Sequence, residues 1–326
     1  MIAVGNMDYR TLGRSGLSVS TVGLGGVELG SGAAGSGEPS ATEAVEAIVA
    51  ALDAGVNWLD TAEAYLETRN ESFIGELLRR LGGRGDELLL STKLLPQPDG
   101  TGFRAEEVRR GCLASLARLG RDRLDIYLLH APDETGVPLE ETWGAMAELV
   151  EDGLVRAIGL SNHAFDDVVR CHTLRTVDLV QDGLSLVDHL DNRATFARCR
   201  EIEIGVVVYE PLGSGTLSGK PIDEIRKAWA GWSEFGFYKR LLAGQNGDRS
   251  AALVNGLRPV AAQQGGSVPQ LAIAWVLHQD GVTAALAGST NPEHVAANAV
   301  AAQLHLPDGV LAELDALIPL GPTMGI

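Results

Sequence analysis

The chain has 326 residues, of which 45% are hydrophobic and 21% are charged, and its formal net charge is −17 at pH 7. This length fits either two domains or one α/β barrel of ~250 residues or more. The strong negative charge argues against nucleic acid or an anionic membrane surface as a partner. We therefore expect a globular protein with a large core and neither of these partners.

The sequence shows no targeting or membrane-spanning signal. No basic segment is followed by a long apolar run at the N-terminus, and no stretch approaches the ~18 apolar residues of a membrane span. The cysteines Cys112, Cys171 and Cys199 are scattered, without metal-ligand spacing, which is typical of reduced thiols. These features predict a cytoplasmic protein.

The first segments predict a hairpin followed by a buried strand. Tyr9–Leu12 and Leu17–Val19 flank Gly13–Gly16 as the two arms of a β-hairpin, and such a hairpin can close the bottom of a barrel. Val22–Gly25 is the first predicted barrel strand, and the Gly-rich stretch Gly30–Gly37 is predicted to be a loop.

The first barrel helix carries its own start and stop signals. Ser40 and Glu43 match a capping box. Apolar residues then recur at helical spacing, namely Val45, Ile48, Val49 and Leu52. Gly55 is predicted to end this helix.

From Asn57 onward, short apolar runs alternate with amphipathic segments. The further predicted strands are Asn57–Asp60, Leu88–Lys93, Leu124–His130, Val155–Ser161, Leu179–Gln181, Gly205–Glu210 and Thr283–Ala287. The further predicted helices are Ser72–Leu81, Ala105–Leu119, Leu139–Glu151, Asp166–Leu174, Asn192–Glu201, Ser250–Gln264, Pro269–His278, Pro292–Ala302 and Asp308–Leu317. This alternation favours a single (β/α)8 TIM barrel over residues 1–326, with an N-terminal β-hairpin and a long irregular loop after strand 7. A doubly wound sheet fits less well, because no Gly-x-Gly-x-x-Gly follows the first strand.

Ionisable residues stand at the ends of three successive strands. Asp60 ends one strand and Tyr65 follows it in the same loop, while Lys93 and His130 end the next two strands. Because the carboxyl ends of barrel strands meet at one mouth, these four side chains are expected to lie together. An acid, a tyrosine, a lysine and a histidine in one place indicate general acid catalysis.

Each of these residues alone has a simpler explanation. A strand-end aspartate often caps the next helix, and a lysine there is usually solvated. A histidine after an apolar run is often a hydrogen-bonded core residue. The combination of four residue types at consecutive strand ends favours a catalytic site.

Together, Asp60, Tyr65, Lys93 and His130 resemble the catalytic tetrad of the aldo-keto reductase superfamily. The resemblance implies that Tyr65 is the general acid, that Lys93 lowers the pKa of Tyr65, and that Asp60 keeps Lys93 protonated. It also implies that His130 orients the substrate oxygen. The implied reaction is hydride transfer between NADP(H) or NAD(H) and a small-molecule aldehyde, ketone or sugar, with no metal.

Later segments resemble the cofactor-binding segments of this family, so that the resemblance spans roughly Asp8 to Ala302. It implies that Ser161, Asn162 and Gln181 hold the nicotinamide carboxamide and that Tyr209 stacks on its ring. The residues implied along the pyrophosphate are Leu212, Gly213, Ser214 and Lys220. The residues implied around the adenosine end are Gly288, Ser289, Thr290, His294 and Asn298.

Two residues depart from the family pattern near these sites. Glu210 stands where serine is common, and a carboxylate beside a pyrophosphate repels it unless it points away. Leu66 follows the tyrosine where many members have glycine.

The stretch Gly288–Asn298 contains no Arg or Lys for the 2′-phosphate of NADP(H), only His294. We therefore expect NAD(H) to be accepted at least as readily as NADP(H), since buried phosphates are normally met by Arg or Lys. The alternative is that Arg240 or Arg249, in the insertion, reaches the phosphate.

The insertion after the seventh strand concentrates aromatic residues, namely Trp229, Trp232, Phe235, Phe237 and Tyr238. They either form a lid over cofactor or substrate, or anchor the insertion on the barrel rim.

Two other functions fit part of the sequence. Potassium-channel β-subunits resemble reductases but act through a partner, and a turnover assay or a large exposed apolar patch would distinguish such a protein from an enzyme. A metal-dependent barrel hydrolase would need a His-x-His pair on the first strand, and Val22–Gly25 has none.

Overall fold

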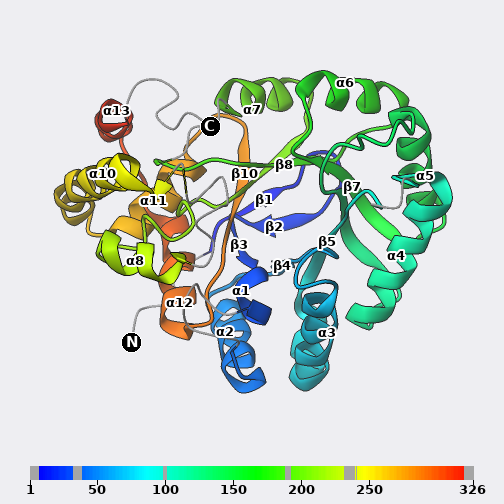
Figure 1. Cartoon of the computed structure of the whole chain (residues 1–326), viewed down its shortest axis with the longest axis horizontal. Coiled ribbons are helices and arrows are strands. Elements are labelled where there is room, and N and C mark those ends of the chain that lie inside the picture. Colours follow the sequence, from blue (N-terminus) through cyan, green and yellow to red (C-terminus); the bar gives the residue numbers. More distant parts are fainter. Residues whose placement is uncertain are drawn as a thin grey trace.

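The computed structural model describes residues 7–31, 39–97, 101–187, 192–230, 239 and 241–318. Within these residues, parallel strands close into a barrel in the order β10-β3-β4-β5-β6-β7-β8-β9, surrounded by helices (Figure 1). The strands are β3 (Val22–Gly25), β4 (Trp58–Asp60), β5 (Leu89–Leu94), β6 (Leu124–Leu129), β7 (Val155–Ser161), β8 (Leu179–Gly183), β9 (Gly205–Tyr209) and β10 (Val282–Ala287). The predicted (β/α)8 barrel is confirmed.

The helices begin and end mostly near the predicted positions. They are α1 (Val27–Ser31), α2 (Ala41–Asp53), α3 (Arg69–Leu81), α4 (Ala105–Leu119), α5 (Leu139–Glu151), α6 (Phe165–Leu174), α7 (Asn192–Glu201), α8 (Ile222–Ala228), α10 (Gly244–Gln263), α11 (Val268–Leu277), α12 (Pro292–Val300) and α13 (Asp308–Leu317), with 3-10 turns η1 (Gly82–Glu87) and η3 (Ala301–Gln303). The predicted capping box is present at α2, where the backbone N–H of Glu43 donates to Ser40 Oγ at 3.2 Å. Among the described helices, none is both long and apolar enough to cross a membrane.

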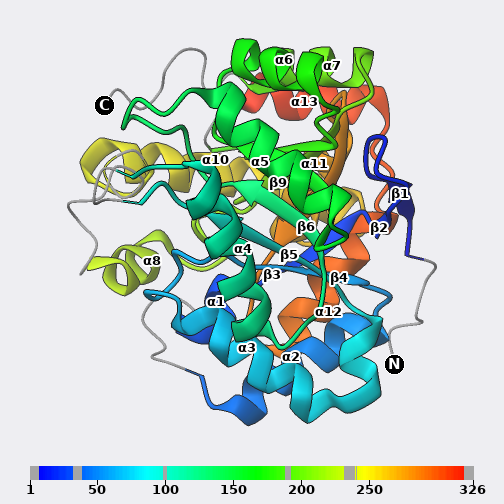
Figure 2. The same ribbon diagram turned by 90° about the vertical axis from the view of Figure 1, so that its right-hand side faces the viewer.

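The N-terminal hairpin closes the bottom of the barrel. Strands β1 (Tyr9–Thr11) and β2 (Ser18–Ser20) pair antiparallel. Leu12, Leu17 and Val19 are buried in one cluster with the side chains that fill the barrel interior. The hairpin and α8 therefore lie at opposite ends of the barrel (Figure 2), which leaves the carboxyl ends of the strands free for a site.

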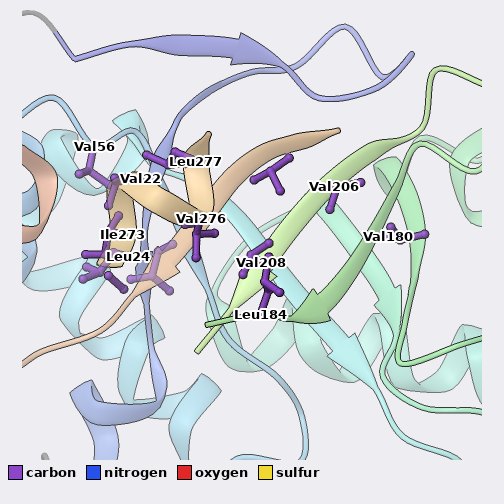
Figure 3. Packing of buried hydrophobic residues seen from close by; sticks show 14 of the residues in the cluster. Val22, Leu24, Val56, Val180, Leu184, Val206, Val208, Ile273, Val276 and Leu277 are labelled. Atoms are coloured by element: carbon purple, nitrogen blue, oxygen red, sulfur yellow. The ribbon is translucent and has the colours of Figure 1, made fainter. Parts of the chain in front are cut away.

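Alternate residues of each strand face two different cores. Val207 of β9 faces the barrel interior, whereas Val206 and Val208 belong to the layer between strands and helices. Figure 3 shows part of that layer, including Val206 and Val208 together with Ile273 from α11. Both faces of the sheet are thus buried, as expected for a parallel barrel.

The insertion after β9 is less irregular than predicted, because it contains α8. This helix has Asp223 and Glu224 in its first turn and Arg226 and Lys227 in its last, which complements the helix dipole. Its Pro221 N-cap and this charge order were signals that the prediction missed. Of the aromatic residues, Trp229 follows α8, while Trp232, Phe235, Phe237 and Tyr238 lie outside the described residues.

Helix α1 was not predicted, and two helices begin three or more residues earlier than predicted. α1 overlaps the start of the predicted loop Gly30–Gly37, whose remainder lies outside the described residues, and α3 begins at Arg69 rather than Ser72. α10 begins at Gly244 rather than Ser250, although its first residues are poor helix formers. Tertiary contacts stabilise this start, since Arg226 of α8 donates to the carbonyl of Gly244 and to Asp248.

Candidate active site

The four predicted catalytic side chains converge at the carboxyl ends of β4, β5 and β6. Lys93 Nζ donates to Asp60 Oδ1 at 2.5 Å and to the backbone carbonyl of Thr61 at 2.8 Å, and lies 3.4 Å from the hydroxyl of Tyr65. The rings of Tyr65 and His130 meet edge to face, with centroids 5.7 Å apart. The sequence-based expectation that these residues lie together is met.

Asp60 is held on both carboxylate oxygens. Its Oδ1 accepts from Lys93, and its Oδ2 accepts from Ser91 Oγ at 2.7 Å and from Gln181 Nε2 at 3.0 Å. The side chains of Lys93 and Asp60 are only 1% and 5% exposed. A buried ion pair with these additional hydrogen bonds fixes the ammonium beneath the tyrosine hydroxyl.

Burial and the neighbouring charges shift the pKa values of Lys93 and Tyr65 in opposite directions. Burial lowers the pKa of Lys93, but Asp60 and Tyr65 outweigh it and leave the pKa raised. Burial raises the pKa of Tyr65 above its ordinary value, and the charge of Lys93 opposes this rise. The effect of Lys93 on Tyr65 has the predicted sign, but the net shift of Tyr65 is upward, because burial dominates.

His130 is neutral at physiological pH. Burial, with a smaller effect from the positive Lys93, lowers its pKa to about 3. A neutral imidazole has one donor and one acceptor nitrogen, so His130 can hydrogen-bond a substrate oxygen without supplying its own charge. Its Nδ1 has no hydrogen-bond partner among the described residues.

The loop that carries Tyr65 has an unusual backbone. Leu66, Glu67 and Thr68 all have positive φ, of 52°, 53° and 72°. Each non-glycine residue in this conformation costs ~1–2 kcal/mol. The surrounding structure must therefore hold the loop in place.

Asn70, fully buried at the start of α3, ties this loop to the barrel rim. Its Oδ1 accepts from Thr61 Oγ1 at 2.6 Å, its Nδ2 donates to the carbonyl of Gly26 at 3.0 Å, and its backbone N–H donates to the carbonyl of Tyr65. No sequence motif indicated this residue, because its partners come from two separate segments, the loops after β3 and β4.

We expect Asn70→Ala to lower both stability and turnover. Unsatisfied buried partners cost ~1–3 kcal/mol each, and misplacement of Tyr65 should reduce kcat by ~10-fold or more. The matched control is Asn57→Ala. Asn57 hydrogen-bonds Ser18 and Ser20 at the opposite end of the barrel, so its loss should lower stability but not kcat. Thermal unfolding and kcat measured for both variants test this, and equal kcat losses would contradict a positioning role for Asn70.

A cleft of ≈ 1100 Å³ opens above the tetrad. It extends from the strand ends between the loop after β9 and helices α8, α10, α11 and α12. The predicted site residues that line it are Asp60, Tyr65, His130, Ser161, Asn162, Gln181, Tyr209, Leu212, Ser214, Lys220, Gly288, Ser289, His294 and Asn298. Lys93, Gly213 and Thr290 are not among the described lining residues. This volume lies slightly above the ~300–1,000 Å³ typical of ligand sites.

A model of the aldo/keto reductase family matches residues 21–319. The chain belongs to the aldo/keto reductase family. Members of this family are in general NAD(P)-dependent oxidoreductases. Among the described residues, no group of three or more His, Cys, Asp or Glu side chains is arranged to hold a metal ion.

The residues expected to hold the nicotinamide of an aldo/keto reductase are linked to the tetrad. Asn162, at φ 62°, donates from Nδ2 to the carbonyl of His130 and accepts from the hydroxyl of Tyr209 at 2.7 Å. Gln181 donates to Asp60. Hydrogen bonds thus join Asn162, Tyr209 and Gln181 to residues of the tetrad.

The cleft fits a dinucleotide in its polar lining. Ser214 lines it, and the hydroxyl oxygen of Ser214 has no hydrogen-bond partner among the described residues. The predicted Tyr209, Gln181 and Asn162 lie at one end, and His294 and Asn298 line the wall formed by α12. These groups would hold the nicotinamide and adenosine ends respectively.

Glu28 and Arg258 are among the charged residues of the cleft that sequence reasoning missed. Glu28, in α1, reaches Gly288, where an added Cβ would lie 2.0 Å from its carboxylate. Burial, followed by the charge of Glu210, raises the pKa of Glu28. Arg258, in α10, also lines the cleft. Neither belongs to a motif, and only the folded chain brings them to the cleft.

Neither of the two arginines considered for the 2′-phosphate is placed in the cleft by the described residues. Arg240 lies outside the described residues, and Arg249 is not among the described lining residues of the cleft.

The three cysteines, Cys112, Cys171 and Cys199, are free and buried, and burial raises the pKa of each to about 12. Their thiols therefore stay protonated and take no part in the site.

Proposed function

We propose that the protein transfers hydride between NAD(P)(H) and a small aldehyde, ketone or sugar, with Tyr65 as general acid and base. The observation that supports this most is the buried contact of Lys93 with both Asp60 and Tyr65, below a cleft that Tyr65 lines. The bound cofactor would supply or accept the hydride at the substrate carbon. The protein would supply the proton and hold the substrate oxygen.

In the reduction direction, the hydroxyl of Tyr65 donates its proton to the carbonyl oxygen. The phenolate that remains is stabilised by the ammonium of Lys93, which lies 3.4 Å away and is held by Asp60. His130, neutral and beside Tyr65, hydrogen-bonds the same oxygen and orients it. In oxidation, the phenolate takes the proton from the alcohol.

A titration with NADH and NADPH, followed by a panel of aldehydes, ketones, sugars and alcohols, tests this proposal. Trp229 lines the cleft, so quenching of tryptophan fluorescence can report binding. We expect binding and turnover on at least one class of the panel. Failure to bind either cofactor would contradict the proposal.

Binding without turnover would instead favour a partner-binding protein on the same scaffold. The exposed large apolar side chains of the described residues are Tyr9, Val27, Leu113, Val169, Leu174 and Leu317, distributed over β1, α1, α4, α6 and α13. This distribution does not favour that alternative, which we keep as an outcome of the assay.

We expect NADH to bind at least as tightly as NADPH. Within Gly288–Asn298 no Arg or Lys meets the 2′-phosphate, and His294 is the one residue there that can become positive. Dissociation constants measured side by side at low salt test this. A preference for NADPH above ~100-fold, about 2.7 kcal/mol, would contradict it and indicate a cationic partner for the 2′-phosphate.

A further inference from the structure

The described lining of the cleft contains more acidic than basic residues, although a dinucleotide is an anion. The Asp and Glu residues of the described lining are Glu28, Asp60, Glu210 and Glu224. The Arg and Lys residues of that lining are Lys220 and Arg258. A pyrophosphate is an anion, and it needs positive charge to enter a cleft that already contains these carboxylates.

Arg258 reaches the cleft from α10 and contacts the loop after β9. Its Nη2 donates to the carbonyl of Gly219 at 3.0 Å, directly before Lys220. Gly219, at φ 83°, also lines the cleft, as do Gly215 and Ser218 of the same loop. The guanidinium therefore lies beside the segment Leu212–Lys220.

The guanidinium of Arg258 retains capacity for a ligand. Among the described residues, no carboxylate lies within ion-pair distance of it, and the bond to Gly219 uses one of its several N–H donors. Arg226 of α8 differs, because it bonds Asp223 and Asp248 and two backbone carbonyls. Within the described part of the chain, Arg226 has carboxylate partners, whereas Arg258 has a single backbone carbonyl.

We propose that Arg258 binds the pyrophosphate of the dinucleotide together with Lys220, in a cleft whose lining carries more acidic than basic residues. This inference rests on the proposed function, because it presumes that a dinucleotide occupies the cleft. It assigns the charge to the pyrophosphate rather than the 2′-phosphate, since the hydrogen bond of Arg258 joins it to the loop after β9, which is the segment expected along the pyrophosphate. Arg258 thereby contributes to cofactor binding without a part in hydride transfer.

The test is Arg258→Met, with dissociation constants for NADH, NADPH and ADP-ribose at low and high salt. We expect all three ligands to bind at least ~10-fold more weakly, about 1.4 kcal/mol, because all three contain the pyrophosphate. The salt dependence of binding should fall as well, since one phosphate-contacting cation is lost. Arg258→Lys should retain part of the affinity, because it keeps the charge but not the planar fork.

Arg249→Met is the matched control on the same helix, outside the described lining of the cleft. It should leave all three dissociation constants unchanged. Unchanged binding by Arg258→Met would overturn the inference, and a loss confined to NADPH would overturn it by placing the guanidinium at the 2′-phosphate. If the wild-type protein binds NADH or NADPH, either result for Arg258→Met leaves the proposed function intact. If the wild-type protein binds no dinucleotide, both the proposed function and the role of Arg258 are contradicted.

Discussion

Tyr65→Phe is expected to slow hydride transfer by ~10²-fold or more while leaving cofactor binding close to wild type. The hydroxyl that it removes lies against Lys93 and lines the cleft, whereas the residues proposed to hold the cofactor lie on later strands and helices. The measurement is kcat on the best substrate together with the dissociation constant of the cofactor.

Tyr127→Phe is the matched control for that variant. Tyr127 is fully buried in β6, and its hydroxyl has no hydrogen-bond partner among the described residues. Its replacement should leave kcat unchanged. This control distinguishes the loss of the general acid from the effect of removing any tyrosine hydroxyl from the barrel. Near-wild-type turnover by Tyr65→Phe would show that Tyr65 is not the acid.

Lys93→Met is expected to lower the rate and also to change its pH dependence. The charge of Lys93 lowers the pKa of Tyr65 against the effect of burial, so its removal raises that pKa further. Alcohol oxidation requires the phenolate, and its pH profile should therefore shift to higher pH. Rate profiles of both reaction directions test this, and an unchanged profile would contradict the role of Lys93.

The same variant should lose stability, because Asp60 keeps its charge without its counter-ion. Breaking a buried pair in this way costs ~3–5 kcal/mol. Lys93→Met combined with Asp60→Asn should recover part of the stability but none of the activity, which separates unfolding from loss of chemistry. The pKa of Lys93 is raised in the folded protein. Its charge therefore contributes fully to the free energy of unfolding below the unfolded-state pKa of ~10.4, and this contribution is lost as the pH rises through the folded-state pKa.

The barrel was predictable because its strands are buried on both faces and its helices have regular apolar spacing. Helices α4, α5, α7 and α13 begin and end at the predicted residues. The predicted helix boundaries were wrong where tertiary contacts override local helix preference. An example is the Gly-rich start of α10, where Arg226 donates a hydrogen bond to the carbonyl of Gly244.

The contact between Asp60, Lys93 and Tyr65 was also predictable, since consecutive parallel strands bring their ends together. The supporting residues were not. Asn70, Glu28 and Arg258 reach the site from helices whose placement depends on the whole fold, and none stands at a strand end or in a motif. The net rise in the pKa of Tyr65 likewise depends on burial, which residue spacing does not report.

Transfer of deuterium from C4-deuterated NADH or NADPH to a carbonyl substrate tests the proposed reaction most directly. Mass spectrometry of the alcohol product detects the label. Deuterium in the product of the wild-type protein, formed ~10²-fold more slowly or not at all by Tyr65→Phe, is the predicted result. Tight cofactor binding without labelled product from any carbonyl tested, or equal transfer by Tyr65→Phe, would contradict it.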